Sequence, residues 1–322
     1  MAAVESSRLL PGPVRMHGWF RCLTLATAVA TFALVVLGGV VRVTGSGLGC
    51  PDWPLCHGSI LPPGQLEAVI EYTHRLVSSV IVGPLVVATT VGAWVLYRRQ
   101  RWLVVPATLG LVLLLAQVAL GGAAVRSELS PGTVAAHLAL GEALLACLVV
   151  IYTVTGGGLL ELQSGSGANR GDPLPKLALV SAIGLYLLIL SGSYVTVSGA
   201  TAACGTHWPL CQGGIFPDGV LPKVHMAHRF AAILVGVLLM YALHLGFRGR
   251  HRSPQVRLVS MATAALFLVQ MLVGALAVWL RFPVGLTALH VAMATAVWCT
   301  TVALVVLTFS WRLVPNKEPL HA

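Results

Sequence analysis

Eight long apolar runs divide this chain of 322 residues, and each is long enough to cross a bilayer, which takes about 20 residues in a helix. Such spans are helical, because a backbone in lipid must satisfy its own hydrogen bonds. The composition agrees, since 57% of the residues are hydrophobic and 9% are charged, against about a quarter charged in soluble domains. The sequence therefore predicts an all-α integral membrane protein with eight transmembrane helices at about residues 20–43, 68–96, 102–124, 133–155, 177–198, 223–246, 257–280 and 285–310.

The basic residues predict how the chain is oriented. The net charge is +10, but the cations lie in short breaks between apolar runs, so we expect contact with lipid head groups and no nucleic-acid partner. One side of the membrane holds more of them, and the positive-inside rule makes that side cytoplasmic, with both termini inside and the cysteine-containing loops outside. The richer side carries Arg8, Arg15, Arg21, Arg98, Arg99, Arg101, Arg170, Lys176, Arg248, Arg250, Arg252, Arg257, Arg312 and Lys317, and the other carries Arg42, Arg75, Arg126, Lys223, Arg229 and Arg281. Residues 1–18 lack the length and the Arg/Ser richness of a transit peptide, so we expect a bacterial cell membrane.

Four landmarks occur twice at nearly constant spacing, which predicts an internal repeat. Trp53-Pro-Leu-Cys56 and Trp208-Pro-Leu-Cys211 lie 155 positions apart, His74-Arg75 and His228-Arg229 lie 154 apart, and Gln117 and Gln270, like His137 and His290, lie 153 apart. Each half has four spans, so both halves have the same orientation, as in a parallel repeat with a pseudo-two-fold axis along the membrane normal. We predict a cytoplasmic tail at 1–18, a four-helix half at 19–155, a linker at 156–176, a second four-helix half at 177–310 and a tail at 311–322.

Four histidines lie near the outer ends of the even-numbered spans, His74 and His137 in the first half and His228 and His290 in the second. Ionisable residues inside spans are costly and usually have a function, although a single histidine can equally well hydrogen-bond a neighbouring helix. Two imidazoles from two helices of one bundle are a common way to hold a haem iron. Zinc is the alternative, but it usually takes three or four ligands. We therefore predict one bis-histidine haem site in each half.

Charged residues accompany these histidines. Arg75 and Arg229 directly follow a histidine and could pair with haem propionates, or extend to lipid head groups. Glu71 shares a helix face with His74, and the second half has His225 at that position, so the two sites are predicted to differ. Glu71 could move protons in an oxidation, or merely cap the helix start or pair with Arg75.

Several glycines and the cysteines complete the pattern. Gly38-Gly39, Gly121-Gly122 and Gly274 fit a close approach of a helix or a macrocycle, with ordinary small-residue packing as the alternative. Disulfides are permitted outside the cell, and the simplest pairing is Cys50 with Cys56 and Cys204 with Cys211. Such pairs can be structural or redox-active. The three remaining cysteines lie in apolar runs and are expected to be buried apolar side chains: Cys22, Cys147 and Cys299.

The run from Gly38 to Cys56, followed by Glu71-Tyr-Thr-His74-Arg75, resembles the haem A synthase family, and the resemblance extends over about residues 20–310. It implies an oxidoreductase that converts haem O to haem A by oxidising a porphyrin methyl group to a formyl group through successive hydroxylations. It further implies haem b ligated by His228 and His290, with haem O ligated or positioned by His74 and His137 and with Glu71 essential. The cysteine pairs place the chain in the cysteine-containing type of the family, although the second pair has six intervening residues and the first has five.

The resemblance also implies partners, namely haem O synthase and cytochrome oxidase assembly factors. The electron acceptor, a quinone or a redox protein, and any self-association are left open. The residues also fit a di-haem b electron carrier between quinone and the outer cysteines, with no chemistry on the haem itself, and Glu71 in one half favours the enzyme only weakly. A solute transporter leaves the matched histidine pairs unexplained.

Overall fold

The computed structural model describes residues 17–156, 171–249 and 252–309. Within these ranges the ordered segments are helical, and eight of them are long and apolar enough to cross a membrane. Their ends agree with the predicted spans to within three residues, so the all-α class and the eight spans are confirmed. The spans are α1 (Gly18–Val43), the second span formed by α2 (Leu66–Leu76), η2 (Val77–Val82) and α3 (Gly83–Tyr97), then α4 (Arg101–Arg126), α5 (Pro131–Thr155), α7 (Leu174–Val197), α8 (Val220–Arg248), α9 (Pro254–Trp279) and α10 (Val284–Phe309).

Local sequence explains several helix features. Pro131 and Pro254 open α5 and α9, where a missing N–H costs nothing, and Ser253 caps α9 by accepting a hydrogen bond from the N–H of Val256. The second span widens into a π-helical segment, η2, just before Pro84. Proline cannot donate to the carbonyl one turn earlier, which accounts for the altered register there.

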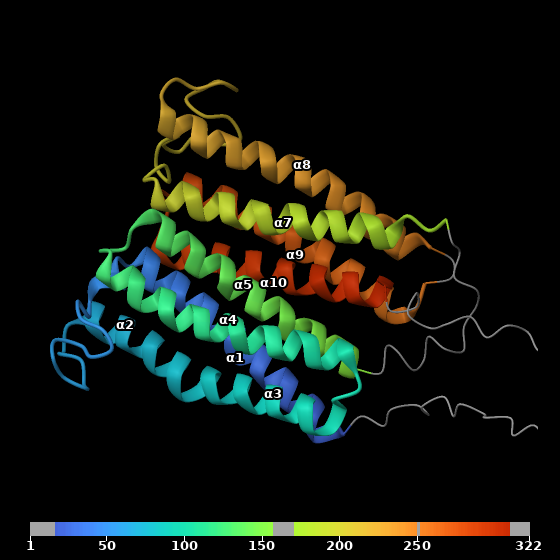
Figure 1. Cartoon of the computed structure of the whole chain (residues 1–322). Coiled ribbons are helices and arrows are strands. Elements are labelled where there is room, and N and C mark those ends of the chain that lie inside the picture. The colour runs from blue at the N-terminus through green and yellow to red at the C-terminus, as the bar shows by residue number, and fades with distance from the viewer. Residues whose placement is uncertain (1–16, 157–170, 250–251, 310–322) are drawn as a thin grey trace, which may run out of the picture.

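The helices lie side by side (Figure 1), and the contacts within each half close into a ring. In the first half α1 packs against α3 and α5, and α4 packs against the same two helices. In the second half α7 and α9 each pack against both α8 and α10. The rings meet where α10 contacts α1 and α5 and where α5 contacts α7. The predicted division at 19–155 and 177–310 fits these contacts and stays a proposal, while both tails and most of the linker lie outside the described residues.

Two polar contacts join the halves at positions that the repeat makes equivalent. Thr295 of α10 donates a hydrogen bond to Glu142 of α5 at 2.8 Å, and these residues are 153 positions apart. Arg42 of α1 donates to the carbonyl of Thr196 of α7 at 3.4 Å, across 154 positions. Equivalent positions meet only where a two-fold axis passes, so both contacts support the predicted pseudo-two-fold relation, which itself stays a prediction.

Large apolar side chains cover the outside of the bundle. Val95, Leu234 and Val237 are 72%, 73% and 67% exposed, although each belongs to a residue type that is usually buried in soluble proteins. Side chains of this kind face lipid in a membrane protein. The exposure pattern therefore agrees with a multi-pass protein whose helices have their outer faces in the bilayer.

Candidate functional site

The first loop is closed by a disulfide between Cys50 and Cys56, as predicted. Asp52 tightens the turn that follows, because its carboxylate accepts hydrogen bonds from the backbone N–H groups of His57 at 2.6 Å and Gly58 at 2.7 Å. The hydrogen bond from Gly58, supported by that from His57, lowers the pKa of Asp52. The loop is thus a small structured unit on the end of the bundle.

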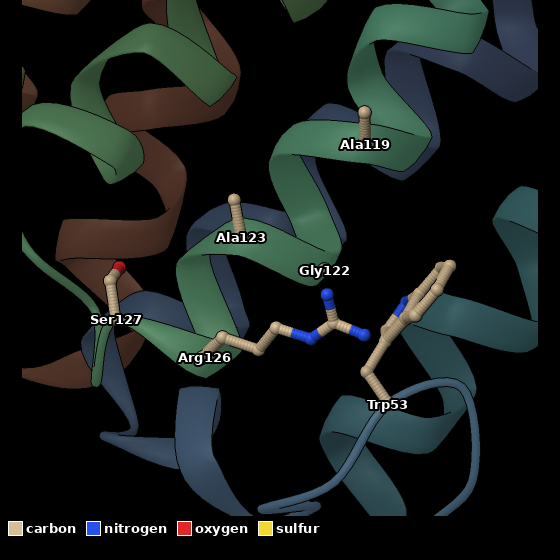
Figure 2. A pocket seen from close by; sticks show the side chains of 6 residues that line it. All are labelled: Trp53, Ala119, Gly122, Ala123, Arg126 and Ser127. Atoms are coloured by element: carbon tan, nitrogen blue, oxygen red, sulfur yellow. The ribbon is translucent and has the colours of Figure 1, made fainter.

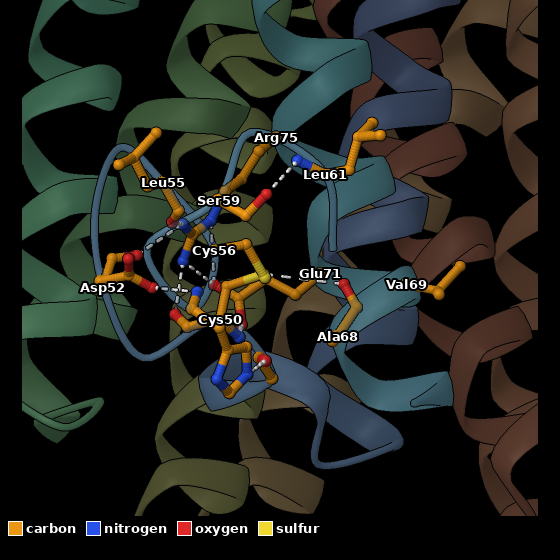
Figure 3. Close-up of a disulfide and its surroundings, with 12 residues drawn as sticks. Cys50, Asp52, Leu55, Cys56, Ser59, Leu61, Ala68, Val69, Glu71 and Arg75 are labelled. Carbon is orange, nitrogen blue, oxygen red and sulfur yellow. Dashed lines mark hydrogen bonds and ion pairs between the residues drawn. A yellow bond between two sulfur atoms is a disulfide. The ribbon is translucent and has the colours of Figure 1, made fainter. Parts of the chain in front are cut away.

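Arg75 fastens this loop to α2 (Figure 3). Its guanidinium donates to the carbonyl oxygens of Asp52 at 2.8 Å, Leu55 at 2.9 Å and Cys50 at 2.8 Å. Five N–H donors in a planar fork make arginine suited to several carbonyls at once. These bonds give Arg75 a structural role that the sequence did not predict, and its contact with a haem propionate stays untested.

Glu71 is buried, at 5% exposure, between the guanidinium and the loop. Its Oε1 accepts from Nε of Arg75 at 3.2 Å, and its Oε2 accepts from the backbone N–H of Cys50 at 3.3 Å. The pairing with Arg75 is therefore confirmed as a contact. The capping alternative is wrong, because α2 begins at Leu66 after Gln65, more than one turn before Glu71.

The second loop repeats this construction with one change. A disulfide joins Cys204 to Cys211, as predicted, and Arg229 donates to the carbonyl oxygens of His207, Pro209 and Leu210 at 2.9, 3.0 and 2.7 Å. His225 takes the place of Glu71 and lies 3.4 Å from the guanidinium of Arg229 through Nε2. The same scaffold thus presents a carboxylate in one half and an imidazole in the other.

Each of the four predicted histidines lies against a glycine of a neighbouring helix. An added methyl group on that glycine would lie 2.9–3.6 Å from Cε1 of the ring, so the imidazole packs directly on backbone. The pairs are His74 with Gly38, His137 with Gly121, His228 with Gly192, and His290 with Gly274. Gly192 was missed from the sequence, although it lies 154 positions after Gly38 and the repeat spacing alone could have identified it.

Among the described residues, three of these imidazole rings have a buried nitrogen without a hydrogen-bond partner, which makes them candidate ligands. Nδ1 of His74, His137 and His290 is buried without a hydrogen-bond partner in the described part of the chain, whereas Nδ1 of His228 lies 2.7 Å from the hydroxyl of Ser191. Buried polar atoms without partners are uncommon in folded proteins and call for an explanation. Two imidazoles on two helices of one ring would be able to hold a haem iron.

Zinc gains no support from the arrangement. The described residues contain no group of three or more His, Cys, Asp or Glu side chains placed to hold a metal ion. Zinc sites usually need at least three such ligands. The described residues therefore form no site of three or more zinc ligands, and the bis-histidine interpretation stays a prediction.

Glu142 is a buried carboxyl that the sequence analysis missed. Its side chain is 0% exposed, Oε1 accepts from Thr295, and Oε2 has no hydrogen-bond partner in the described ranges. The indole of Trp298 donates to its backbone carbonyl at 3.0 Å. It lies five residues beyond His137 on α5, about 7.5 Å further along the helix axis. Its contacts with α10 of the other half set it apart from the four histidines.

Comparison with known proteins agrees with the resemblance of the loop motif. The family model COX15-CtaA, described as a cytochrome oxidase assembly protein, matches residues 21–69 and 64–302. A heme A synthase of Alkalihalophilus pseudofirmus is 30% identical over 256 residues, covering 79% of this chain and 84% of that protein. A heme A synthase of Bacillus cereus is 28% identical over 298 residues, covering 91% and 94%. A third heme A synthase, from an Exiguobacterium species, is 31% identical over 243 residues, covering 75% and 76%.

Proposed function

The chain belongs to the COX15-CtaA family of cytochrome oxidase assembly proteins, and from that membership we propose that it is a haem A synthase, an oxidoreductase of the membrane that converts haem O to haem A. In the proposed reaction a methyl group of the substrate porphyrin is oxidised to a formyl group by successive hydroxylations. The relatives named above, all heme A synthases, support the assignment over most of the chain.

The difference between Glu71 and His225 carries the proposal. Both residues stand three positions before a histidine, on the same scaffold of disulfide and arginine. Only the first half has a carboxylate, which can accept a proton, at this position beside its histidine site. We therefore assign the first half to the substrate and the second to a resident cofactor.

In this proposal the residues have separate roles. His74 and His137 ligate or position haem O, and Glu71 takes up a proton at its carboxylate as the methyl group is oxidised. His228 and His290 hold haem b, which when bound supplies a centre that accepts electrons. Arg75 and Arg229 order the outer loops, and their proposed contact with propionates would add to that function.

The proposal includes a cellular setting. The chain would lie in a bacterial cell membrane with both termini in the cytoplasm and both disulfide loops outside. Haem O synthase would supply the substrate, cytochrome oxidase assembly factors would receive the product, and a quinone or a redox protein would accept the electrons. Lateral entry from lipid suits a substrate with an isoprenoid tail.

Mass analysis of haems extracted from the purified protein tests this function. The protein is produced with and without a source of haem O, and haem O in the membranes is measured separately. We expect haem A, or hydroxylated haem O, only with that source, and not in a matched Glu71→Gln preparation. Haem b alone in both samples, with haem O present in the membranes, would instead indicate the di-haem electron carrier.

A further inference from the structure

A pocket of about 450 Å³ lies at the outer end of α4, beside the first disulfide loop. Figure 2 shows the guanidinium of Arg126 extending toward the indole of Trp53 across this pocket. The remaining lining is small, formed by Ala119, Gly122, Ala123 and Ser127. The pocket therefore combines one aromatic face with one cation.

Trp53 is held in place by a glycine. A methyl group on Gly122 would lie 3.1 Å from Cδ2 of the indole, tighter than ordinary packing. The neighbouring Gly121 faces His137 instead, where a methyl group would lie 3.6 Å from Cε1. Two consecutive residues of α4, about 100° apart around the helix, thus contact the tryptophan of the pocket and a histidine of the first site.

The second half has no equivalent cation at this position. Helices α4 and α9 correspond from end to end at a spacing of 153, which places Trp279 where the first half has Arg126. Trp279 packs edge-on against Trp208, the counterpart of Trp53, with ring centroids 5.5 Å apart. An aromatic side chain therefore stands in the second half where the first half has a cation.

Arg126 differs from the arginines that hold the loops. It is exposed, and within the described ranges its guanidinium takes part in no hydrogen bond or ion pair. Arg75 and Arg229, in contrast, each bind three loop carbonyls. A free guanidinium beside an indole suits a ligand with a flat apolar face and a carboxylate, because the fork binds carboxylates in a bidentate manner.

We propose that Trp53 and Arg126 form a docking subsite for a propionate-bearing edge of the substrate haem, present in the first half and replaced by a tryptophan pair in the second. The proposal rests on the function proposed above and adds a structural reason why one half exchanges its haem while the other retains it. A lipid phosphate could satisfy the same cation, so the experiment must separate the two sources.

Binding of haem O and of its dimethyl ester tests the subsite. The full-length protein, loaded with haem b, is titrated in discs of neutral lipid and followed by absorbance. We expect wild-type protein to bind haem O roughly tenfold more tightly than the uncharged ester, as for one charge-assisted interaction. Arg126→Gln and Arg126→Trp should lose this preference while still binding the ester, and Arg126→Lys should keep part of it.

Two controls keep the outcomes distinct. Arg281→Gln removes the nearest outer cation after α9 and should leave the preference unchanged. His74→Ala should weaken the binding of haem O and of the ester alike, because this histidine belongs to the proposed haem site and not to the subsite. A wild-type protein that binds neither ligand would contradict the proposed function, and not the subsite alone. If Arg126→Gln keeps the preference for haem O over the ester, the subsite is overturned. If the preference of the wild-type protein disappears once anionic lipid is added to the discs, the subsite is also overturned and the pocket is assigned to lipid phosphate.

Discussion

The imidazole of His228 is fixed from α7 by two consecutive residues. A methyl group on Gly192 would lie 3.0 Å from Cε1 of the ring, and the hydroxyl of Ser191 lies 2.7 Å from Nδ1. The backbone therefore limits where the ring can lie, and the hydroxyl limits how it can turn. A hydrogen bond to the ring nitrogen that does not bind the metal commonly orients a ligating histidine.

Replacing Gly192 by alanine should displace His228. A contact of 3.0 Å forces either the ring or the helix to move, which typically costs about 1–3 kcal/mol. We expect Gly192→Ala to retain about tenfold less haem b per protein, measured by extraction after purification. Gly285→Ala is the matched control in the same half, because no atom lies within 4 Å of the added methyl group; equal retention in the two variants would contradict the prediction.

Glu71→Gln should separate folding from chemistry. Glutamine can still accept a hydrogen bond from Arg75, but its amide nitrogen cannot accept the second bond, from the N–H of Cys50, so we expect haem b content close to wild type and a small loss of thermal stability. Loss of a positioned proton acceptor commonly lowers a rate by about 10² or more, and haem A formation in membranes should fall accordingly. Glu67→Gln, an exposed residue of the same helix, should turn over normally, and wild-type activity in Glu71→Gln would reduce Glu71 to a structural residue.

Arg229→Met should loosen the loop closed by Cys204 and Cys211. Three carbonyls lose their donor, and hydrogen bonds to charged groups contribute about 1.5–3 kcal/mol each, with incomplete additivity and partial replacement by water. We expect faster proteolysis between Cys204 and Gly219 and a stability loss of about 2 kcal/mol. Lys223→Met, an exposed cation of the same helix, serves as control; if both variants are cleaved at the wild-type rate, the arginine does not hold the loop.

Thiol titration should count three reactive cysteines in unfolded, unreduced protein. The structure leaves Cys22, Cys147 and Cys299 free and pairs the other four of the seven cysteines. Reduction should raise the count to seven. Peptide mapping without reductant should join Cys50 to Cys56, and a peptide linking the two loops would contradict the pairing.

Acidification should loosen the first loop through Asp52. Hydrogen bonds from Gly58 and His57 lower the pKa of this carboxyl in the folded protein. The stabilisation is therefore fully present above its ordinary pKa of about 4 and is lost as the pH falls from there through the lowered folded value. Asp52→Asn should remove this acid-dependent change in loop proteolysis, and the second loop, with His207 at this position, gives an internal comparison.

Most features that depend on local composition were predicted from the sequence, although Cys22, expected to be buried, is exposed. Hydropathy located the spans, and two nearby cysteines in each cysteine-containing loop left one simple pairing. Gly192 was missed, because a glycine inside an apolar helix has no local signature. Only its spacing from Gly38 points to it. The repeat therefore carried more information about the site than the composition did.

The acceptors of Arg75 and Arg229 could not be read from the sequence. They are backbone carbonyls, which every residue has, so no side-chain pattern identifies them. Glu142 was missed for a related reason, since its donor Thr295 lies 153 positions away on another helix. Contacts of these two kinds depend on the three-dimensional path of the chain.

The bond between Glu142 and Thr295 also has a consequence for synthesis of the chain. Glu142 enters the membrane with the fourth span, but Thr295 and Trp298, which donate to its side chain and its carbonyl, enter with the eighth. Until α10 is inserted, the carboxyl of Glu142 lies within the membrane without the hydrogen bond from Thr295, and an unpaired polar group there is costly. The first half is synthesised first, but the hydrogen bonds to Glu142 form only after α10 has been inserted. Insertion of α10 is therefore the step that joins the two halves through these bonds.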